Sequence, residues 1–400
     1  MTFFRGLLSS LALLAASLAS WEALPNSREL LPVGQQAPSS YRAIGHVPNL
    51  YAAYVAPDGR IFGIEDHFLY VSEDQGRTFT QAGVLPKINP SWRDRITNVL
   101  ARSKTARALR HNPGPNNLVV LSSGTILVFW GYIYRSTDNG QTFAPVFNFE
   151  DERVNPGFQY SEGLALGPDD TVYFGEYVTT ARPHEVRILE GRQDGTSWKV
   201  AHTFPAGEIF HVHGIQYDPY RAGYWITTGD FDDEAKILFT KDGFRSFMTL
   251  GSGSQDWRAV SLMITKDRLL WGSDNDQEPA GIFEWNFGTS TLTKLQEIGK
   301  PSYYSTRLAD GTFVLSTTYK PQSRYTKKYQ PEAATDLWVS RNGFTWTKIL
   351  SLPYKMEQEA WGLSRAAIAF PGGKATEQLL FTPISTVRDR FTTQFIDPRP

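Results

Sequence analysis

Short apolar segments, each followed by a turn and a second apolar segment, recur along most of the chain. One such unit is NNLVVLSSGTILVFW, in which two apolar runs flank Ser-Ser-Gly. Runs of this length and composition favour β-strands, and the small polar residues between them favour a tight reversal. The pattern predicts seven β-hairpins, whose first strands lie within residues 49–60, 116–125, 162–171, 213–223, 258–268, 304–312 and 362–373.

A polar motif follows a third apolar run in several of these units. It is SEDQGRTF at 72–79 and STDNGQTF at 136–143, and it returns with changes as TKDGFRSF at 240–247 and SRNGFTW at 340–346. A weaker copy, QDGTSW, lies at 193–198. Asp or Asn can accept bonds from backbone amides in a hairpin turn, and Gly allows a positive φ. The four clear copies begin 64, 104 and 100 residues apart, which corresponds to one, two and two periods of about 50 residues.

The motif resembles the Asp-box, or BNR, repeat of the sialidase-like β-propellers. The first copy matches that repeat at Ser72, Asp74, Gly76, Thr78 and Phe79, and the second copy matches it at the equivalent positions. The third copy has Gly243 one place early, and the fourth has Asn342 in place of Asp. The resemblance implies a propeller over about residues 40–396. It leaves the activity open, because Asp-boxes also occur in propellers that are not sialidases.

We therefore expect an all-β chain that forms a single β-propeller of seven four-stranded blades, with six blades as the alternative. The motif copies fall in units one, two, four and six, and the weaker copy falls in unit three. The last unit is one strand short, and residues 28–46 can supply that strand and close the ring. Residues 89–115 are expected to form a partly helical insertion before blade two, and residues 319–335 a long loop in blade six.

The N-terminus has the layout of a secretory signal peptide. Arg5 is the only charge before an apolar run, and Ser17-Leu18-Ala19 supplies small residues suited to cleavage. We expect a signal peptide over residues 1–20, a propeller domain over 21–400, and a secreted or periplasmic location. An uncleaved anchor is the alternative, and no later segment approaches the length of a membrane span.

Composition limits the partners and the chemistry. The net charge of −1 gives no reason to expect a nucleic acid partner. The chain has 11 Trp, 18 Tyr and 25 Phe, which suits a β-rich protein that binds sugar rings. It has no cysteine, so disulfides, thiolate metal sites and cysteine nucleophiles are excluded.

In a propeller, the starts of the first strands and the ends of the second strands emerge on one face, which we call the channel mouth. The residues expected there are Tyr51, Glu162, Glu176, Tyr177, His213, Asp230, Arg258, Asp274, Tyr303, Tyr304, Tyr319 and Trp361. This mixture suits an acidic carbohydrate, because Arg binds carboxylates, aromatic rings stack on sugars, and acids or His transfer protons. The catalytic candidates are Glu162, His213, Asp230, Asp274 and Tyr303, and the other seven residues are candidates for substrate binding.

His211 and His213 are two residues apart on a predicted strand, so they face the same side. With Asp230 as a third ligand they could bind zinc. They could also be structural, with one histidine capping a loop and the other bonded to the backbone. We favour a third possibility, in which His213 faces the ligand. Asp274 and Asp276 could hold calcium, although the loop lacks the spacing of a known calcium loop. We therefore assign no metal and no cofactor.

Three functions remain open. The favoured one is an exported, sialidase-like glycoside hydrolase for an acidic glycan, in which Arg258 binds the carboxylate and Glu162, Asp230 or Asp274 supply acid–base pairs. Classical sialidase activity is disfavoured, because the early Arg-Ile-Pro motif of sialidases is absent. The second is a uronate lyase, in which His213 removes a proton and Tyr303 or Tyr304 protonates the leaving oxygen. The third is a non-catalytic propeller that binds glycans or acts as a scaffold.

Overall fold

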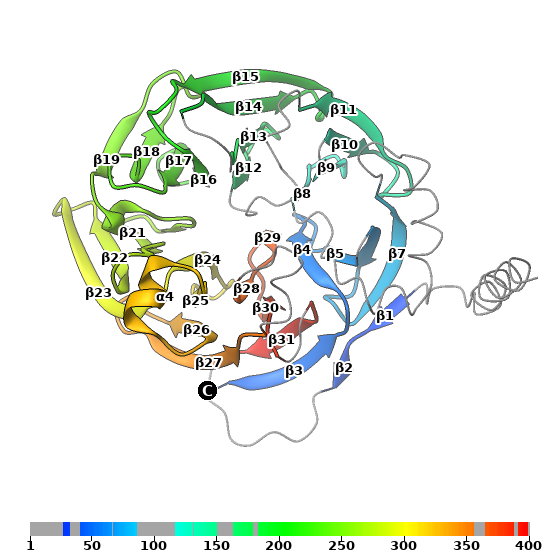
Figure 1. Ribbon diagram of the computed structural model, residues 1–400. Coiled ribbons are helices and arrows are strands. Elements are labelled where there is room, and N and C mark those ends of the chain that lie inside the picture. The colour runs from blue at the N-terminus through cyan, green and yellow to red at the C-terminus, as the bar shows by residue number, and fades with distance from the viewer. Residues whose placement is uncertain are drawn as a thin grey trace, which may run out of the picture.

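The computed structural model describes residues 27–32, 41–65, 67–85, 117–130, 132–149, 163–178, 183–355, 365–387 and 391–398. Strands dominate this part of the chain, and they are arranged around a central axis (Figure 1). The predicted signal peptide, the insertion at 89–115, Glu162 and Trp361 lie outside the described residues. None of the helices in the described segments is both long enough and apolar enough to span a membrane.

Seven sheets form seven blades, which confirms the seven-bladed prediction over the six-bladed alternative. The four strands of each blade pair antiparallel, in sequence order in blades one to six, and the first of them lies nearest the central axis. Blade one contains β4 (Tyr51–Val55), β5 (Ile61–Glu65), β6 (Phe68–Ser72) and β7 (Thr78–Val84). Blade two contains β8 (Leu118–Val120), β9 (Ile126–Trp130), β10 (Tyr132–Ser136) and β11 (Ala144–Asn148). Blade three contains β12 (Leu164–Leu166), β13 (Val172–Gly175), β14 (Val186–Arg192) and β15 (Ser197–Phe204).

The next three blades repeat this order. Blade four contains β16 (His211–Asp218), β17 (Gly223–Gly229), β18 (Lys236–Thr240) and β19 (Met248–Ser252). The short helix η3 (Gln255–Trp257) precedes blade five, which contains β20 (Met263–Ile264), β21 (Arg268–Gly272), β22 (Ala280–Asn286) and β23 (Thr291–Gly299). Blade six contains β24 (Ser302–Arg307), β25 (Phe313–Thr317), β26 (Ala334–Ser340) and β27 (Thr347–Pro353).

Blade seven joins the two ends of the described chain. It contains β28 (Ala367–Ala369), β30 (Leu379–Ile384), β31 (Thr393–Asp397) and the N-terminal strands β3 (Arg42–Val47) and β2 (Leu31–Pro32). Figure 1 shows β3 beside β31, and the two pair antiparallel. This confirms that the segment 28–46 supplies the missing strand. Two short strands, β1 (Ser27–Glu29) and β29 (Gly372–Gly373), extend the sheet of blade one.

Apolar side chains between neighbouring blades form the core. The first strands β4 and β28 are buried at every position, whereas the outermost strands β15 and β23 keep several residues exposed. Phe129 of blade two stacks on Phe174 of blade three with ring centres 5.0 Å apart. Trp225 and Trp271 belong to one buried cluster that spans blades four and five. Burial of such rings is worth about 1.5–3 kcal/mol per side chain, so contacts between blades stabilise the ring.

The recurring motifs form turns between the third and fourth strands, as the sequence predicts. In the first copy Asp74 accepts bonds from the Thr78 backbone amide (2.9 Å) and hydroxyl (2.7 Å), and Gly76 donates to the Ser72 hydroxyl (2.8 Å). Gly76 has φ +89°, and a Cβ there would lie 2.4 Å from the Phe395 ring. Because strand direction alternates, these turns lie on the face opposite the channel mouth, which we call the far face.

The segment 319–335 differs from the loop that we expected. It contains the helix α4 (Arg324–Tyr329), and the Ser323 hydroxyl accepts the Thr326 backbone amide (3.1 Å) as an N-cap. The run of Pro, Lys and Tyr favours a loop, and a helix of about one and a half turns is too short to show a periodic apolar face. The sequence therefore does not predict this helix.

The closure between blades seven and one can be tested at Thr393. Its buried hydroxyl donates to Leu50 O (2.6 Å) and accepts the Ala52 N–H (3.0 Å). We expect Thr393→Val to lower the free energy of unfolding by about 1–3 kcal/mol, because buried backbone groups lose a partner. Chemical denaturation measures this loss. The matched control is Thr293→Val on the exposed outer strand β23, and an equal effect of both variants would contradict the prediction.

Candidate functional site

The sequence-predicted residues that come together lie at the channel mouth of blades three to five. They are Tyr177, His213, Asp230, Arg258 and Asp274, joined by His211 and Asp276. We call these seven residues the mouth cluster. They come from the segment after β13, the start of β16, the end of β17, the segment before β20 and the loop after β21. The rule that strand starts and second-strand ends share a face therefore located this group.

A β-bulge positions the second histidine. Along β16 the register with β17 shifts between Val212 and Gly214, so His213 is the extra residue. A bulge of this kind redirects a side chain. The His211 and His213 rings lie with their centres 4.8 Å apart, which confirms that they face the same side. Both residues are only 1% exposed.

Backbone carbonyls fix one nitrogen of each imidazole. His211 Nδ1 lies 3.1 Å from Val178 O, and His213 Nδ1 lies 3.0 Å from Ala259 O. A carbonyl oxygen can only accept, so each Nδ1 must carry the proton. The Nε2 atoms then face the same carboxylate oxygen, Asp230 Oδ1, at 3.6 Å and 3.3 Å. Burial lowers the pKa of His211, which favours its neutral form at pH 7.

Asp230 approaches the histidines because the residue before it is glycine. A Cβ on Gly229 would lie 2.3 Å from His213 Cε1, so any other residue would push the ring away. The Asp230 side chain keeps 30% of its surface exposed and is one of the more accessible parts of the mouth cluster. Burial opposes its ionisation, but the adjacent Arg258 guanidinium holds the pKa of Asp230 far below its usual range.

Arg258 is buried beside Asp230 and forms ion pairs with three carboxylates. Its Nη2 donates to Asp230 Oδ1 (2.7 Å) and to Asp274 Oδ2 (2.9 Å), and its Nη1 contacts Asp276 Oδ1 (3.2 Å). Burial disfavours its charge, yet the carboxylates of Asp274, Asp230 and Asp276 raise the pKa of Arg258 above its usual value. At neutral pH one guanidinium and three carboxylates carry a formal charge of 1 − 3, or −2. Arg258 was expected to meet a substrate carboxylate, and the protein's own acids occupy it instead.

The other predicted residues have different surroundings. Tyr177 stacks on His211 with ring centres 3.8 Å apart and so belongs to the cluster. Glu176 is buried and pairs with Arg187 through its side chain (2.6 Å) and backbone amide (2.9 Å), which ties β13 to β14. Tyr51 and Tyr304 pack in the hydrophobic core instead of facing a ligand.

Blade six supplies a second group at the mouth. Tyr303 is fully buried, and its ring lies 4.7 Å from Lys320 Nζ and 5.4 Å from Arg365 Cζ. Within the described residues Lys320 pairs with no carboxylate. Tyr319 is half-buried beside them, and its backbone pairs with that of Ala366. Because Tyr303 is buried, it does not reach a substrate, and the two half-buried cations are the groups that can.

The two groups are neighbours in space. The Ser302 amide at the start of β24 donates to Ser273 O (3.0 Å), directly before Asp274. The Tyr325 amide of α4 donates to Asp276 O (2.6 Å), so the helix covers the same loop. Arg365 was missed from the sequence, although it precedes β28 as Arg258 precedes β20. The strand-start rule, applied to the last unit, could have found it.

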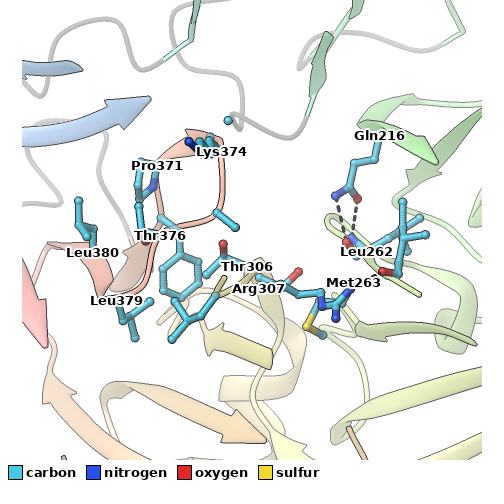
Figure 2. A pocket seen from close by; sticks show the side chains of 17 residues that line it. Gln216, Leu262, Met263, Thr306, Arg307, Pro371, Lys374, Thr376, Leu379 and Leu380 are labelled. Carbon is cyan, nitrogen blue, oxygen red and sulfur yellow. Dashed lines mark hydrogen bonds between the residues drawn. The ribbon is translucent and has the colours of Figure 1, made fainter. Parts of the chain in front are cut away.

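A separate hollow of about 290 Å³ opens at the far-face ends of β16, β20 and β24 (Figure 2). Gln216 joins the Leu262 backbone through two hydrogen bonds, 2.9 Å and 2.6 Å, drawn as dashed lines in Figure 2. Arg307 donates to Ile264 O (2.9 Å). These polar groups connect blades to each other, so the hollow is a weaker candidate site than the mouth.

No protein-family profile and no curated protein sequence matches the chain. Solved structures do resemble it. An oligogalacturonate lyase in complex with manganese has a TM-score of 0.54 and 11% identity, over 92% of this chain and 99% of that chain. A chain of a mitotic checkpoint complex has a TM-score of 0.52 and 10% identity, over 95% and 96%.

A GH74 enzyme from Niastella koreensis also resembles the chain, with a TM-score of 0.50 and 13% identity. The match covers 77% of this chain and 46% of that enzyme. At identities this low, the likenesses concern the fold, because one propeller architecture serves many unrelated activities.

The charge balance of the mouth cluster can be tested at Arg258. We expect Arg258→Ala to lower the free energy of unfolding by about 3–5 kcal/mol, because it leaves neighbouring carboxylates without their buried counter-ion. Denaturant titration measures the loss. Arg341→Ala, at an exposed turn, should change it by less than about 0.5 kcal/mol. A loss below about 1 kcal/mol for Arg258→Ala would show that the cluster is more hydrated than its burial indicates.

Proposed function

We propose that the protein is an enzyme that cleaves an acidic carbohydrate at the channel mouth, by β-elimination beside a uronate carboxylate. The proposal rests on one observation. Two half-buried cations, Lys320 and Arg365, converge on the Tyr303 ring, next to a cluster whose carboxylates already bind Arg258.

The cations favour a negatively charged sugar. Lys320 has no carboxylate partner among the described residues, and its amine stays close to a buried ring. A carboxylate-bearing ligand would supply the missing partner through charge-assisted hydrogen bonds. The half-buried rings of Tyr177 and Tyr319 add aromatic surface of the kind that sugars stack on. Resemblance to an oligogalacturonate lyase and to a GH74 enzyme supports a carbohydrate ligand.

The carboxylates of the mouth cluster favour elimination. The sequence alone favours hydrolysis. A glycosidase requires one carboxyl group that stays protonated and a second that is ionised. Asp230, Asp274 and Asp276 all contact one guanidinium, and the pKa of Asp230 is lowered instead of raised. In elimination a base takes the C5 proton, a C4=C5 double bond forms as the C4–O bond breaks, and the leaving oxygen is protonated. Cations are needed to stabilise the charge that grows on the uronate carboxylate when the C5 proton is removed. We assign that role to Lys320 and Arg365.

The test uses purified protein on a panel of uronate-containing polysaccharides, with a neutral polysaccharide for comparison. Ultraviolet absorbance of unsaturated uronates and the appearance of reducing ends are followed together. We expect both signals to rise in parallel. Reducing ends without absorbance would overturn elimination in favour of hydrolysis. Binding without either product would leave a recognition module.

The proposed carboxylate contact predicts that Lys320→Met lowers kcat/KM for the uronate substrate by about 10- to 100-fold, the usual effect of removing a hydrogen bond to a charged group. The matched control is Lys327→Met on the exposed side of α4, in the same insertion, which should retain full activity. Full activity in Lys320→Met would remove the lysine from the site.

A further inference from the structure

We propose that His211 Nε2, His213 Nε2 and Asp230 Oδ1 form a binding site for a divalent transition-metal ion. The site stands on the geometry of the mouth cluster alone. Only its role toward an acidic carbohydrate rests on the proposed function.

The hydrogen bonds of the imidazoles prepare both rings as ligands. Val178 O and Ala259 O accept from the two Nδ1 atoms, so Nε2 is the nitrogen of each ring that can coordinate an ion. Metal-binding histidines commonly donate their other ring nitrogen to a backbone carbonyl, because this fixes the tautomer and orients the ring. The two bonds therefore turn both Nε2 atoms toward Asp230.

His213 Nε2 lies within hydrogen-bond distance of Asp230 Oδ1 (3.3 Å), but His211 Nε2 does not. His211 Nε2 is buried and has no hydrogen-bond partner among the described residues. Its distance of 3.6 Å to Asp230 Oδ1 exceeds hydrogen-bonding range. A lone pair that faces a carboxylate oxygen inside the protein is repulsive, and an unpaired buried nitrogen is costly. A cation between these atoms would remove both costs.

The distances fit a shared ion. Ligands about 2.1 Å from one metal lie about 3.0–4.2 Å from each other. The Nε2 to Oδ1 distances are 3.3 Å and 3.6 Å, and both lie in this range. The three ligand atoms lie within 4.8 Å of one another, so the two imidazoles need only a small shift to share one ion. Asp230 is 30% exposed at the mouth, so positions not taken by the protein can hold water or a ligand oxygen. Two imidazoles and one carboxylate favour transition metals over magnesium or calcium.

The surrounding charges also favour a dication. Arg258 and its three carboxylates carry a formal charge of −2, which one divalent ion would neutralise. Arg258 donates to the ligand oxygen of Asp230 and so orients it. Asp274 and Asp276 offset the charge of Arg258, so the guanidinium does not exclude the ion. With the ion bound, an acidic sugar would no longer meet a net negative cluster.

The experiment measures metal binding in the absence of carbohydrate. Full-length protein is stripped with a chelator, dialysed against Zn²⁺, and analysed for bound metal and thermal stability. We expect one equivalent of Zn²⁺ and a higher Tm, and neither with Mg²⁺. Co²⁺ should give visible absorption bands that indicate nitrogen ligands. Wild-type protein that retains no Zn²⁺ and shows no Co²⁺ bands would overturn the site.

Ligand variants locate the ion. His211→Ala, His213→Ala and Asp230→Asn should each weaken Zn²⁺ binding by more than about 100-fold, because each removes a ligand. The control His46→Gln changes a histidine of the outer strand β3 and should bind as wild type. Equal binding by all four variants would show an adventitious ion only. Asp230→Asn preserves the shape of the side chain, so a loss of binding in this variant reports on the ligand and not on packing. The Co²⁺ spectrum of the wild type tests the site without any variant.

The two proposals can fail independently. Metal-loaded protein that forms no unsaturated uronate would overturn the elimination activity and leave the metal site intact. Protein that binds no metal but forms the unsaturated product would overturn the metal site and leave the activity intact. If chelator-treated protein keeps full activity although it binds Zn²⁺, the ion has no role in the reaction.

Discussion

The pairing of β3 with β31 determines whether the seven sheets form a ring. A row of sheets would leave an unpaired strand edge and an uncovered apolar face at each end. Closure removes both, because the N-terminal segment completes blade seven and the Thr393 hydroxyl bonds to the backbone of blade one. The mouth depends on this closure, since a ring brings all first strands to one channel.

The mouth cluster shows how a ring assembles chemistry from distant parts of the sequence. His213, Asp230, Arg258 and Asp274 come from two blades, and Arg258 connects them by contacting acids from both. Gly229 makes room for the ring of His213, and backbone carbonyls hold both imidazoles. The side chains therefore have little freedom, as is expected of groups that must hold a ligand in one geometry.

Much of the fold was predictable, because its signals are local. The side chains of Ser72 and Asp74 accept hydrogen bonds from amides four residues further along the chain. Apolar runs separated by turn residues indicate the strands. The sequence predicts which residues lie at the mouth but not which of them are in contact, because these contacts cross between strands and blades. Glu176 and Arg187 pair across β13 and β14, which strand-end position alone does not indicate. Tyr51 and Tyr304 also start strands, but whether such a ring faces the channel or the core depends on the local register.

The register between first and second strands shifts in three of the blades. The first strands of blades one, four and six each carry one extra residue relative to their second strands near the mouth end, namely Ala53, His213 and Tyr303. An extra residue reverses the in–out alternation beyond it. The mouth end of each strand is thus out of phase with the end that packs between blades. Substitutions at the mouth end can change which ligand binds without altering the side chains that pack between the blades. Ligand recognition and blade packing can therefore diverge separately on one strand.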